Sequence, residues 1–385
     1  MTVANVEKNV RERYSEGANT QVKELCCPVD YDPRYLEIIP PEVIERDYGC
    51  GDPSKHLAPG ETVLDLGSGT GKICFIAAQV VGAEGRVIGV DMTPDMLEVA
   101  RRNAPIVAQR TGFANVEFRR GRIQDLALDL DRLEREIAAT PVDSVERLFA
   151  IEHRADELRR DEPMVADDSV DVVVSNCVLN LVENGLKEQL FAEIYRVLRR
   201  GGRAVISDIV SDEEIPQALQ EDPELWSGCV SGAFTESGFL AAFEQAGFHG
   251  IRILERQPEP WRTVEGIEFR SVTVEAFKGK EGPCWERKQA VIYKGPFKEV
   301  TDDDGHRMLR GERYAVCDKT YQLYGQEPYA GSFELVAPRE RIALEDAEPF
   351  DCSRTVQRHP RESKGEDYHV TTEAAGACCG PEDCC

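Results

Sequence analysis

The sequence predicts an α/β fold: a Rossmann-like, mostly parallel sheet covered by helices, followed by a smaller β-rich C-terminal domain. Strand-like and helical segments alternate from about residue 61 to residue 210, which is the pattern of a parallel sheet. After residue 282 the chain changes to short alternating segments separated by turn signals. A chain of 385 residues is also long enough for two or three domains.

Five segments of the alternating region are predicted as strands. The fourth is the most distinctive, because its β-branched apolar run stops at Ser175 and Asn176 and is followed by Cys177. Runs of this kind favour a buried strand. The five predicted strands span residues 61–67, 85–92, 115–121, 169–179 and 202–210.

Helices are predicted between these strands. Residues 72–82 follow a glycine-rich turn, and residues 93–112 begin with Thr93 as N-cap and proline at the first helical position. Residues 187–202 form a helical pattern that ends in glycine. Beyond them we expect helices over 212–248 and strands over 250–257 and 269–278.

The domain boundaries follow from these changes in pattern. Within the α/β domain, residues 127–167 are charged, helical in period and broken by Pro141, so we expect an inserted surface helix pair. The last segment is polar and punctuated by proline and glycine, and we expect it to be disordered. The predicted parts are a helical lead-in with a cysteine loop (1–60), the α/β domain (61–280), the β-rich domain (281–351) and the tail (352–385).

Charge and hydropathy exclude several classes of partner. The chain has 71 acidic and 46 basic residues and a net charge of −25, which repels nucleic acid. No stretch approaches the roughly 20 apolar residues of a membrane span, and the first residues lack the apolar core of a signal peptide. We therefore expect a cytoplasmic monomer with no nucleic-acid or membrane partner.

The chain has 13 cysteines. Without a secretory signal, this number favours thiol chemistry or binding of a soft ion over disulfides. Several are direct neighbours, an arrangement more typical of thiol donor sites than of disulfides. The neighbouring pairs are Cys26-Cys27, Cys378-Cys379 and Cys384-Cys385.

The stretch "VLDLGSGTGK" (63–72) carries the most specific local signal. Its three glycines follow a strand and open a helix, where glycine permits a sharp turn and close approach of a ligand. The G-x-G-x-G spacing is neither the dinucleotide fingerprint nor a P-loop. With an aspartate two residues earlier, it resembles the loop of class I S-adenosylmethionine (SAM) methyltransferases, which packs against the methionine part of SAM. The predicted contacts are Asp65, Gly67, Ser68, Gly69, Thr70 and Gly71.

The ends of the next strands supply the rest of the predicted SAM site. Asp91 lies about 20 residues after the last glycine, the offset of a ribose-binding acid. Met92 is suited to packing on adenine, and Ile123 and Gln124 are expected at the adenine edge. Asn176 is expected to hold the methionine end.

Three cysteines gather around the predicted methyl position. Cys177 follows the fourth strand, where this fold holds the reacting methyl group; alone, it is most simply a buried core residue. Cys50 and Cys229 lie between small residues, so we expect accessible loop thiols. Three converging thiolates could bind a soft, thiophilic centre.

These segments carry a family resemblance. "DYGCGDP", "VLDLGSGTGKI", "SNCVLNL" and "WSGCVSGA" closely resemble the signatures of the arsenite methyltransferases, in their order. The resemblance covers about residues 25–290 and extends more loosely beyond. It implies a detoxifying, SAM-dependent methyltransferase acting on arsenite and methylated arsenicals, with As(III) held as substrate by Cys50, Cys177 and Cys229 and no resident metal.

The resemblance also implies a fourth functional thiol, which can pair with Cys50. Cys26 or Cys27 could serve, and we favour Cys27. The arsenic lone pair would attack the SAM methyl in line, without a base. A Cys27–Cys50 disulfide, formed when arsenic returns to the trivalent state, would then be reset by an external thiol reductant such as glutathione or thioredoxin.

Two alternatives remain. A methyltransferase for a small organic acceptor would need a base, and the motifs contain no histidine; His56 is more simply a loop residue. A thiol-rich scavenger fits the terminal "CCGPEDCC" but leaves the complete SAM site unexplained. Cys74 is most simply core, and the sequence assigns no role to Cys284, Cys317 or Cys352.

Overall fold

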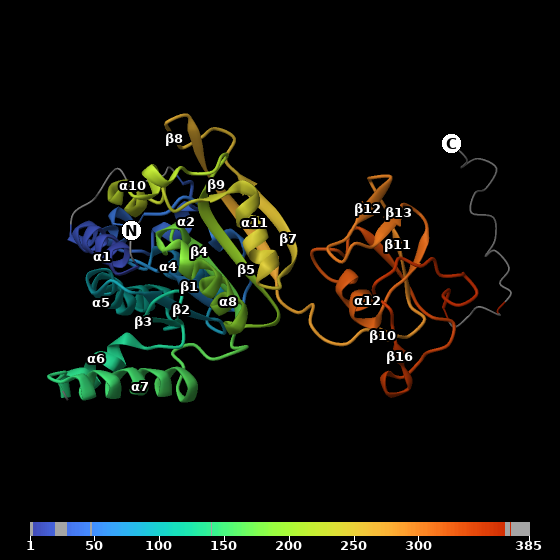
Figure 1. The fold of residues 1–385 in the computed structure, drawn as a ribbon, viewed down its shortest axis with the longest axis horizontal. Helices are drawn as coiled ribbons and strands as arrows, with labels where there is room; N and C mark the ends of the chain where they lie inside the picture. The colour runs from blue at the N-terminus through green and yellow to red at the C-terminus, as the bar shows by residue number, and fades with distance from the viewer. Residues whose placement is uncertain (1–2, 20–28, 47, 140, 366–369, 371–385) are drawn as a thin grey trace. The chain divides into compact units, whose positions relative to one another are not determined.

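The computed structural model describes residues 3–19, 29–46, 48–139, 141–365 and 370. The chain divides into two compact units, Met1–Gly279 and Lys280–Cys385 (Figure 1). In the part of the chain that the structure describes, no helix is both long and apolar enough to cross a membrane.

A mostly parallel sheet forms the centre of the first unit. Its strand order is β3-β2-β1-β4-β5-β9-β7, with β6 beside β5 and β8 beside β9. Strands β1 to β5 pair in parallel, whereas β9 is antiparallel to both β5 and β7. The predicted α/β fold is therefore confirmed. The strands are β1 Thr62–Leu66, β2 Arg86–Asp91, β3 Val116–Arg120, β4 Val170–Asn176, β5 Leu198–Ser211, β6 Phe234–Thr235, β7 His249–Arg256, β8 Arg262–Val264 and β9 Ile267–Phe277.

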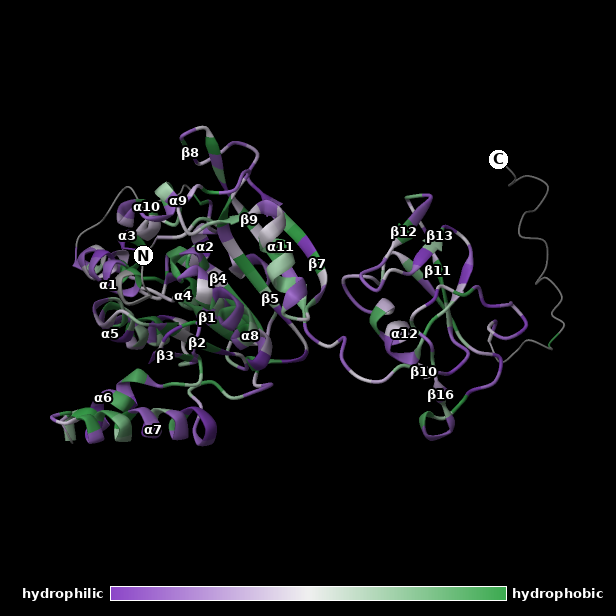
Figure 2. Cartoon of the chain, viewed as in Figure 1, coloured by the Kyte–Doolittle hydropathy of each residue, from purple (hydrophilic) through white to green (hydrophobic). Residues whose placement is uncertain are grey.

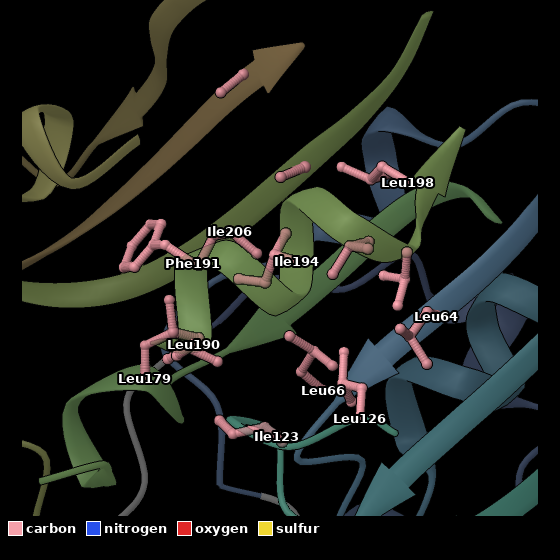
Figure 3. Close-up of a cluster of buried hydrophobic side chains, with 14 of the residues drawn as sticks. Leu64, Leu66, Ile123, Leu126, Leu179, Leu190, Phe191, Ile194, Leu198 and Ile206 are labelled. Carbon is pink, nitrogen blue, oxygen red and sulfur yellow. The ribbon is translucent and has the colours of Figure 1, made fainter. Parts of the chain in front are cut away.

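Helices cover both faces of this sheet because successive strand residues point to opposite sides. Leu64 and Leu66 of β1 pack in one apolar cluster with Phe191 of α8 (Lys187–Val197), as Figure 3 shows. Val63, the residue before Leu64, points to the other side and packs in a second cluster with Phe75 of α4 (Lys72–Val81). Helix α11 (Glu236–Gln245) contributes to the first cluster and α5 (Pro94–Thr111) to the second.

Helix α8 is shorter than the sequence pattern indicates. It ends at Val197, not at residue 202, because the chain enters strand β5 at Leu198. The backbone N–H of Gly201 donates to the carbonyl of Lys278 at 2.8 Å, and the N–H of Lys278 donates to Gly202 at 2.9 Å. Pairing of residues 201 and 202 with Lys278 of the same chain thus takes precedence over helix propensity here.

Short elements surround the sheet. Residues 212–248 are less continuously helical than expected, since α9, α10 and α11 are separated by a loop and by β6. The N-terminal lead-in contains α1, and short helices precede β1. The helices before β1 are α1 Val3–Asn19, α2 Pro33–Leu36, α3 Pro41–Glu45 and η2 Pro53–His56. The short helices after β4 and β5 are η3 Leu179–Leu181, η4 Asn184–Leu186, α9 Gln217–Gln220 and α10 Pro223–Ser227.

Two helices, α6 (Leu130–Ala139) and α7 (Val145–Asp161), occupy the segment between β3 and β4. Leu158 of α7 packs on Leu128 in a small separate cluster, and Arg159 pairs with Asp125 at 2.9 Å. Figure 2 shows apolar residues along β5 but mainly hydrophilic residues along the C-terminal half of α7. This helix pair therefore lies outside the main core.

The described residues of the second unit form short antiparallel strands, helix α12 and the short helix η5, in agreement with the β-rich prediction. Tyr324 stacks on Phe333, with ring centroids 4.3 Å apart, in a core that also contains Val291. The strands pair as β10–β16, β14–β11–β15 and β12–β13. The elements are β10 Trp285–Glu286, β11 Ala290–Tyr293, β12 Glu299–Thr301, β13 Arg307–Leu309, β14 Arg313–Ala315, α12 Asp318–Tyr324, β15 Phe333–Val336, η5 Leu344–Asp346 and β16 Glu348–Pro349.

Residues 352–365 differ from the expected disordered tail. Gln357 forms a β-bridge with Tyr314, and Arg358 pairs with Glu286 at 2.8 Å. The composition of this segment is typical of disorder, but specific pairing with the β-rich unit holds it.

Candidate active site

The glycine loop connects β1 to α4, as the sequence predicts, and its glycines are required by contact and by backbone conformation. Gly67 and Gly69 have φ values of 68° and 52°, in the left-handed region that favours glycine. A Cβ on Gly67 would lie 2.3 Å from a methyl carbon of Val178, whereas a Cβ on Gly69 would meet nothing within 4 Å. The loop is thus packed on one side and approachable by a ligand at Gly69.

A cavity lies over this loop. The lead-in helix α1 contributes Tyr14 to its wall, which the sequence did not indicate. Gly71 does not line the cavity and instead begins α4 as its N-cap. The predicted residues that line it are Asp65, Gly67, Ser68, Gly69, Thr70, Asp91, Met92, Ile123, Gln124, Asn176 and Cys177.

Asp91 ties the glycine loop to the start of α5. Its Oδ2 accepts a hydrogen bond from the N–H of Gly69 at 2.9 Å, and its Oδ1 accepts one from Thr93 at 2.7 Å. Burial raises the pKa of Asp91, and these backbone donors oppose that shift. The carboxylate therefore organises the loop from within the cavity wall.

Ser68 provides a polar group with no protein partner. Its hydroxyl is buried, lines the cavity, and has no hydrogen-bond partner among the described residues. Buried polar atoms are ordinarily hydrogen-bonded, so this hydroxyl is available to a ligand. Asp65, by contrast, accepts a hydrogen bond from the Cys74 thiol at 3.1 Å, and Cys74 is fully buried, as a core residue should be.

The three candidate thiols belong to one apolar cluster. Cys50, Cys177 and Cys229 pack together with Ile209 and Phe269. They are only 6%, 6% and 5% exposed, respectively, so the small neighbours of Cys50 and Cys229 do not make these thiols accessible, contrary to expectation. Because Cys177 also lines the cavity, the cavity reaches the thiol cluster.

Two of these cysteines have an unusual backbone conformation. Cys177 and Cys229 have φ values of 63° and 59°, which are uncommon for residues other than glycine. The thiol of Cys229 donates to the carbonyl oxygen of Cys177 at 3.1 Å, so the two turns support each other. Strained backbone of this kind clusters at functional sites.

Asn176 holds the loop that carries Cys50. Its Oδ1 accepts hydrogen bonds from the N–H groups of Cys50 and Gly51, and its Nδ2 donates to Gly51 and to the Tyr31 hydroxyl. A Cβ on Gly49 would lie 2.2 Å from Nδ2 of Asn176. The glycines beside Cys50 are thus explained by close packing, and the amide expected to hold SAM binds the protein instead.

Asp208 on β5 is a site residue that the sequence analysis missed. One of its carboxylate oxygens lies within 4.8 Å of the sulfur atoms of both Cys50 and Cys177, which are themselves within 4.8 Å of each other. Burial raises the pKa of Asp208 to about 6, while the N–H groups of Ile209 and Leu179 oppose the shift. An acid inside the apolar strand "AVISDIV" is the signal that could have found it.

The fourth thiol is not placed. Cys26 and Cys27 both lie outside the described residues. Near the other thiols, the Tyr14 hydroxyl lies 4.0 Å from the sulfur of Cys229. Burial, followed by the charges of Cys229 and Cys177, raises the pKa of Tyr14, so it is a neutral hydroxyl at this position.

Matches to two protein-family models divide the chain at the same place as the two structural units. A model described as a methyltransferase domain matches residues 57–139 and 153–247, which leaves out the N-terminal part of α7. A domain of unknown function matches residues 280–368.

Individual relatives extend the similarity over most of the chain. An arsenite methyltransferase of Aquipseudomonas alcaligenes is 34% identical and is aligned over 82% of this chain and 86% of its own. The human arsenite methyltransferase is 27% identical over 99% of this chain and 98% of its own. The crystal structure of an arsenic(III) SAM methyltransferase from Chlamydomonas reinhardtii has a TM-score of 0.55 and 29% identity, covering 84% of this chain and 100% of that one.

Proposed function

The chain belongs to the arsenite methyltransferase family, and we propose that it transfers the methyl group of SAM to trivalent arsenic held by Cys50, Cys177 and Cys229. One observation carries this proposal: Cys177 both lines the cavity over the glycine loop and belongs to the three-cysteine cluster. A methyl donor in the cavity and arsenic bound to the thiols would therefore both contact Cys177.

The residues around the glycine loop fit SAM. Ser68 offers a buried hydroxyl with no partner among the described residues, and Gly69 leaves its backbone approachable. The carboxylate of Asp91, fixed by two backbone donors, would accept hydrogen bonds from the ribose. When bound, SAM supplies an electrophilic methyl group on a sulfonium. The remaining contacts would come from Asp65, Gly67, Thr70, Met92, Ile123 and Gln124, which all line the cavity.

The three thiols would take up arsenite by exchanging oxygen for sulfur. Arsenous acid loses its three hydroxyls as water, the protons come from the three thiols, and three As–S bonds replace three As–O bonds without any redox change. Thiolates are the soft ligands that such a centre prefers. Arsenic bound in this way would keep its lone pair, which is the nucleophile toward the methyl group that bound SAM would supply.

The protein contributes to this step mainly by positioning. Asn176 fixes Cys50 relative to Cys177, and the Cys229–Cys177 hydrogen bond fixes the third thiol. The apolar residues around the thiols, such as Ile209 and Phe269, exclude water from the substrate. Orientation of this kind supplies much of the rate of a transfer reaction.

Other parts of the account stay predictions. They are the disulfide between Cys27 and Cys50, its reduction by an external thiol such as glutathione or thioredoxin, and a monomeric enzyme in the cytoplasm. Arsenic oxidised by methylation must gain two electrons to become trivalent again. A dithiol that becomes a disulfide supplies two electrons.

The proposal is tested by incubating the purified protein with methyl-labelled SAM, arsenite and glutathione, and separating the arsenic species by chromatography with arsenic detection. We expect labelled methylarsenic species and an equivalent amount of S-adenosylhomocysteine. Unchanged arsenite would contradict the proposal. Retention of arsenite by the protein without methyl transfer would indicate a scavenger instead.

A further inference from the structure

A second cluster of three thiols lies in the Lys280–Cys385 unit. Cys284, Cys317 and Cys352 are far apart in sequence, yet their sulfur atoms all lie within 4.8 Å of one another. Cys317 is buried, whereas Cys284 and Cys352 are half-buried, and none of the three forms a disulfide. None of them lines the cavity over the glycine loop.

The fold of this unit brings the three cysteines together. Strands β10 and β16 pair, and the N–H of Phe350 donates to the carbonyl of Cys284 at 2.9 Å, which places Cys352 near Cys284. Cys317 is the N-cap of α12, and its sulfur accepts a hydrogen bond from the N–H of Thr320. The cluster is thus defined by secondary structure, not by a single flexible loop.

Three thiols at this spacing fit an ion of the thiophilic class. A metal–sulfur bond of about 2.3 Å places neighbouring sulfur ligands about 3.8 Å apart, and arsenic–sulfur bonds are of similar length. Small side-chain rotations would therefore close the cluster around one atom. Burial, followed by the neighbouring thiols of Cys284 and Cys317, raises the pKa of Cys352, so the thiolate form of Cys352 is disfavoured at this position.

The number of ligands favours arsenic over zinc. Structural zinc sites have four protein ligands, but among the described residues no fourth His, Cys, Asp or Glu joins this group. The imidazole of His306, which contacts Cys352, uses Nε2 on the carbonyl of Cys352 at 2.7 Å and Nδ1 on Asp302 at 2.8 Å. Trivalent arsenic forms three bonds and needs no fourth ligand.

We infer that Cys284, Cys317 and Cys352 form a second trivalent-arsenic site that binds unmethylated arsenite. Binding exchanges three As–O bonds for three As–S bonds, with release of three waters and no redox change. Each methyl group on arsenic occupies one of its three bonds, so the site holds methylated arsenicals through fewer sulfurs and more weakly. The inference rests on the proposed function only for the identity of the metalloid.

A protection experiment on the full-length wild-type chain tests the inference without a variant. Reduced protein is alkylated with iodoacetamide in the presence of arsenite or of methylarsonous acid, and modification of each cysteine is read by peptide mass spectrometry. We expect arsenite to slow alkylation of Cys284 and Cys352 at least tenfold, and methylarsonous acid to protect less. Unprotected Cys284 and Cys352 would overturn the inference.

A variant then isolates this site from the other cysteines. In a full-length chain with serine at Cys26, Cys27, Cys50, Cys177, Cys229 and the four cysteines of residues 378–385, arsenic K-edge absorption should still report three sulfur neighbours. Adding Cys317→Ser, which keeps a capping hydroxyl, should remove them, whereas Cys74→Ser should not. Stoichiometric zinc in the purified chain, or a disulfide within the cluster, would overturn the inference.

The two proposals fail separately. If the wild-type protein methylates no arsenic but arsenite still protects Cys284 and Cys352, the proposed function fails and the second site stands. If Cys317→Ser still methylates arsenic, and arsenite does not protect Cys284 and Cys352 of the wild-type protein from alkylation, only the second site fails.

Discussion

The side-chain amide of Asn176 joins two of the three cysteines proposed to hold arsenic: its Oδ1 accepts a hydrogen bond from the backbone N–H of Cys50 at 2.8 Å. Asn176 directly precedes Cys177, so a single residue fixes the Cys50 loop against the end of β4. Its Nδ2 completes the link by donating to the carbonyl of Gly51 at 2.7 Å. The geometry of the thiol site thus depends on a residue that carries no thiol.

Replacing Asn176 should therefore damage arsenic binding more than SAM binding. Asn176→Ala removes the hydrogen bonds between this side chain and the buried backbone of residues 50 and 51, at a cost of about 1–3 kcal/mol. We expect arsenite affinity and methyl transfer to fall at least tenfold, with SAM affinity changed less, as measured by calorimetry and product analysis. The matched control is Asn115→Ala, which loses two backbone hydrogen bonds away from the site; equal effects would contradict the positioning role.

Cys177→Ser should abolish methyl transfer while SAM affinity stays within about a few-fold, because uptake of arsenic needs a soft thiolate and the oxygen of serine is hard. Equilibrium binding of SAM and single-turnover methylation measure the two effects. Cys74→Ser serves as the control, since Cys74 is a buried cysteine whose contact is with Asp65. Loss of SAM binding in Cys177→Ser would instead indicate that Cys177 is part of the packed core.

Asp91→Asn should weaken SAM binding and leave the thiol site intact. A hydrogen bond to a charged acceptor contributes about 1.5–3 kcal/mol, so we expect roughly a 10- to 100-fold loss of SAM affinity by calorimetry. Arsenite stoichiometry should not change. Asp91 also accepts hydrogen bonds from Gly69 and Thr93, so the control is that the variant still unfolds cooperatively on heating. An unchanged SAM affinity would rule out ribose binding by Asp91.

Asp208 should make folding stability depend on pH. Its folded-state pKa of about 6 lies above the ordinary value of 3.8, so its favourable contribution is greatest at low pH and is lost as pH rises through 6. Between about pH 5 and about pH 7.5, wild type should lose about 1 kcal/mol relative to Asp208→Asn. Urea unfolding of both proteins at both pH values measures the difference; a change of opposite sign would refute the assignment.

Much of the site could be predicted from the sequence because its signals are local. The glycine loop and Asp91 occupy fixed offsets around strand ends, and the structure places them around one cavity. The alternation of strands and helices likewise predicted the sheet. By contrast, the end of α8 depends on pairing with Lys278, some eighty residues away in sequence, which local pattern does not encode.

Residues that act through long-range contacts were missed for the same reason. Asp208 comes near Cys50 only when β5 lies beside β4. The cluster of Cys284, Cys317 and Cys352 depends on the pairing of β10 with β16, and no spacing in the chain indicates it. Glycines beside Cys50 suggested exposure, whereas they permit tight packing against Asn176.

The most direct test of the account is a crystal structure of the full-length protein with arsenite and S-adenosylhomocysteine, with arsenic located by anomalous scattering. The account predicts one arsenic atom bonded to the sulfur atoms of Cys50, Cys177 and Cys229, with its open side facing the cavity over the glycine loop. Arsenic bound without Cys177, or found only at sites away from that cavity, would contradict it.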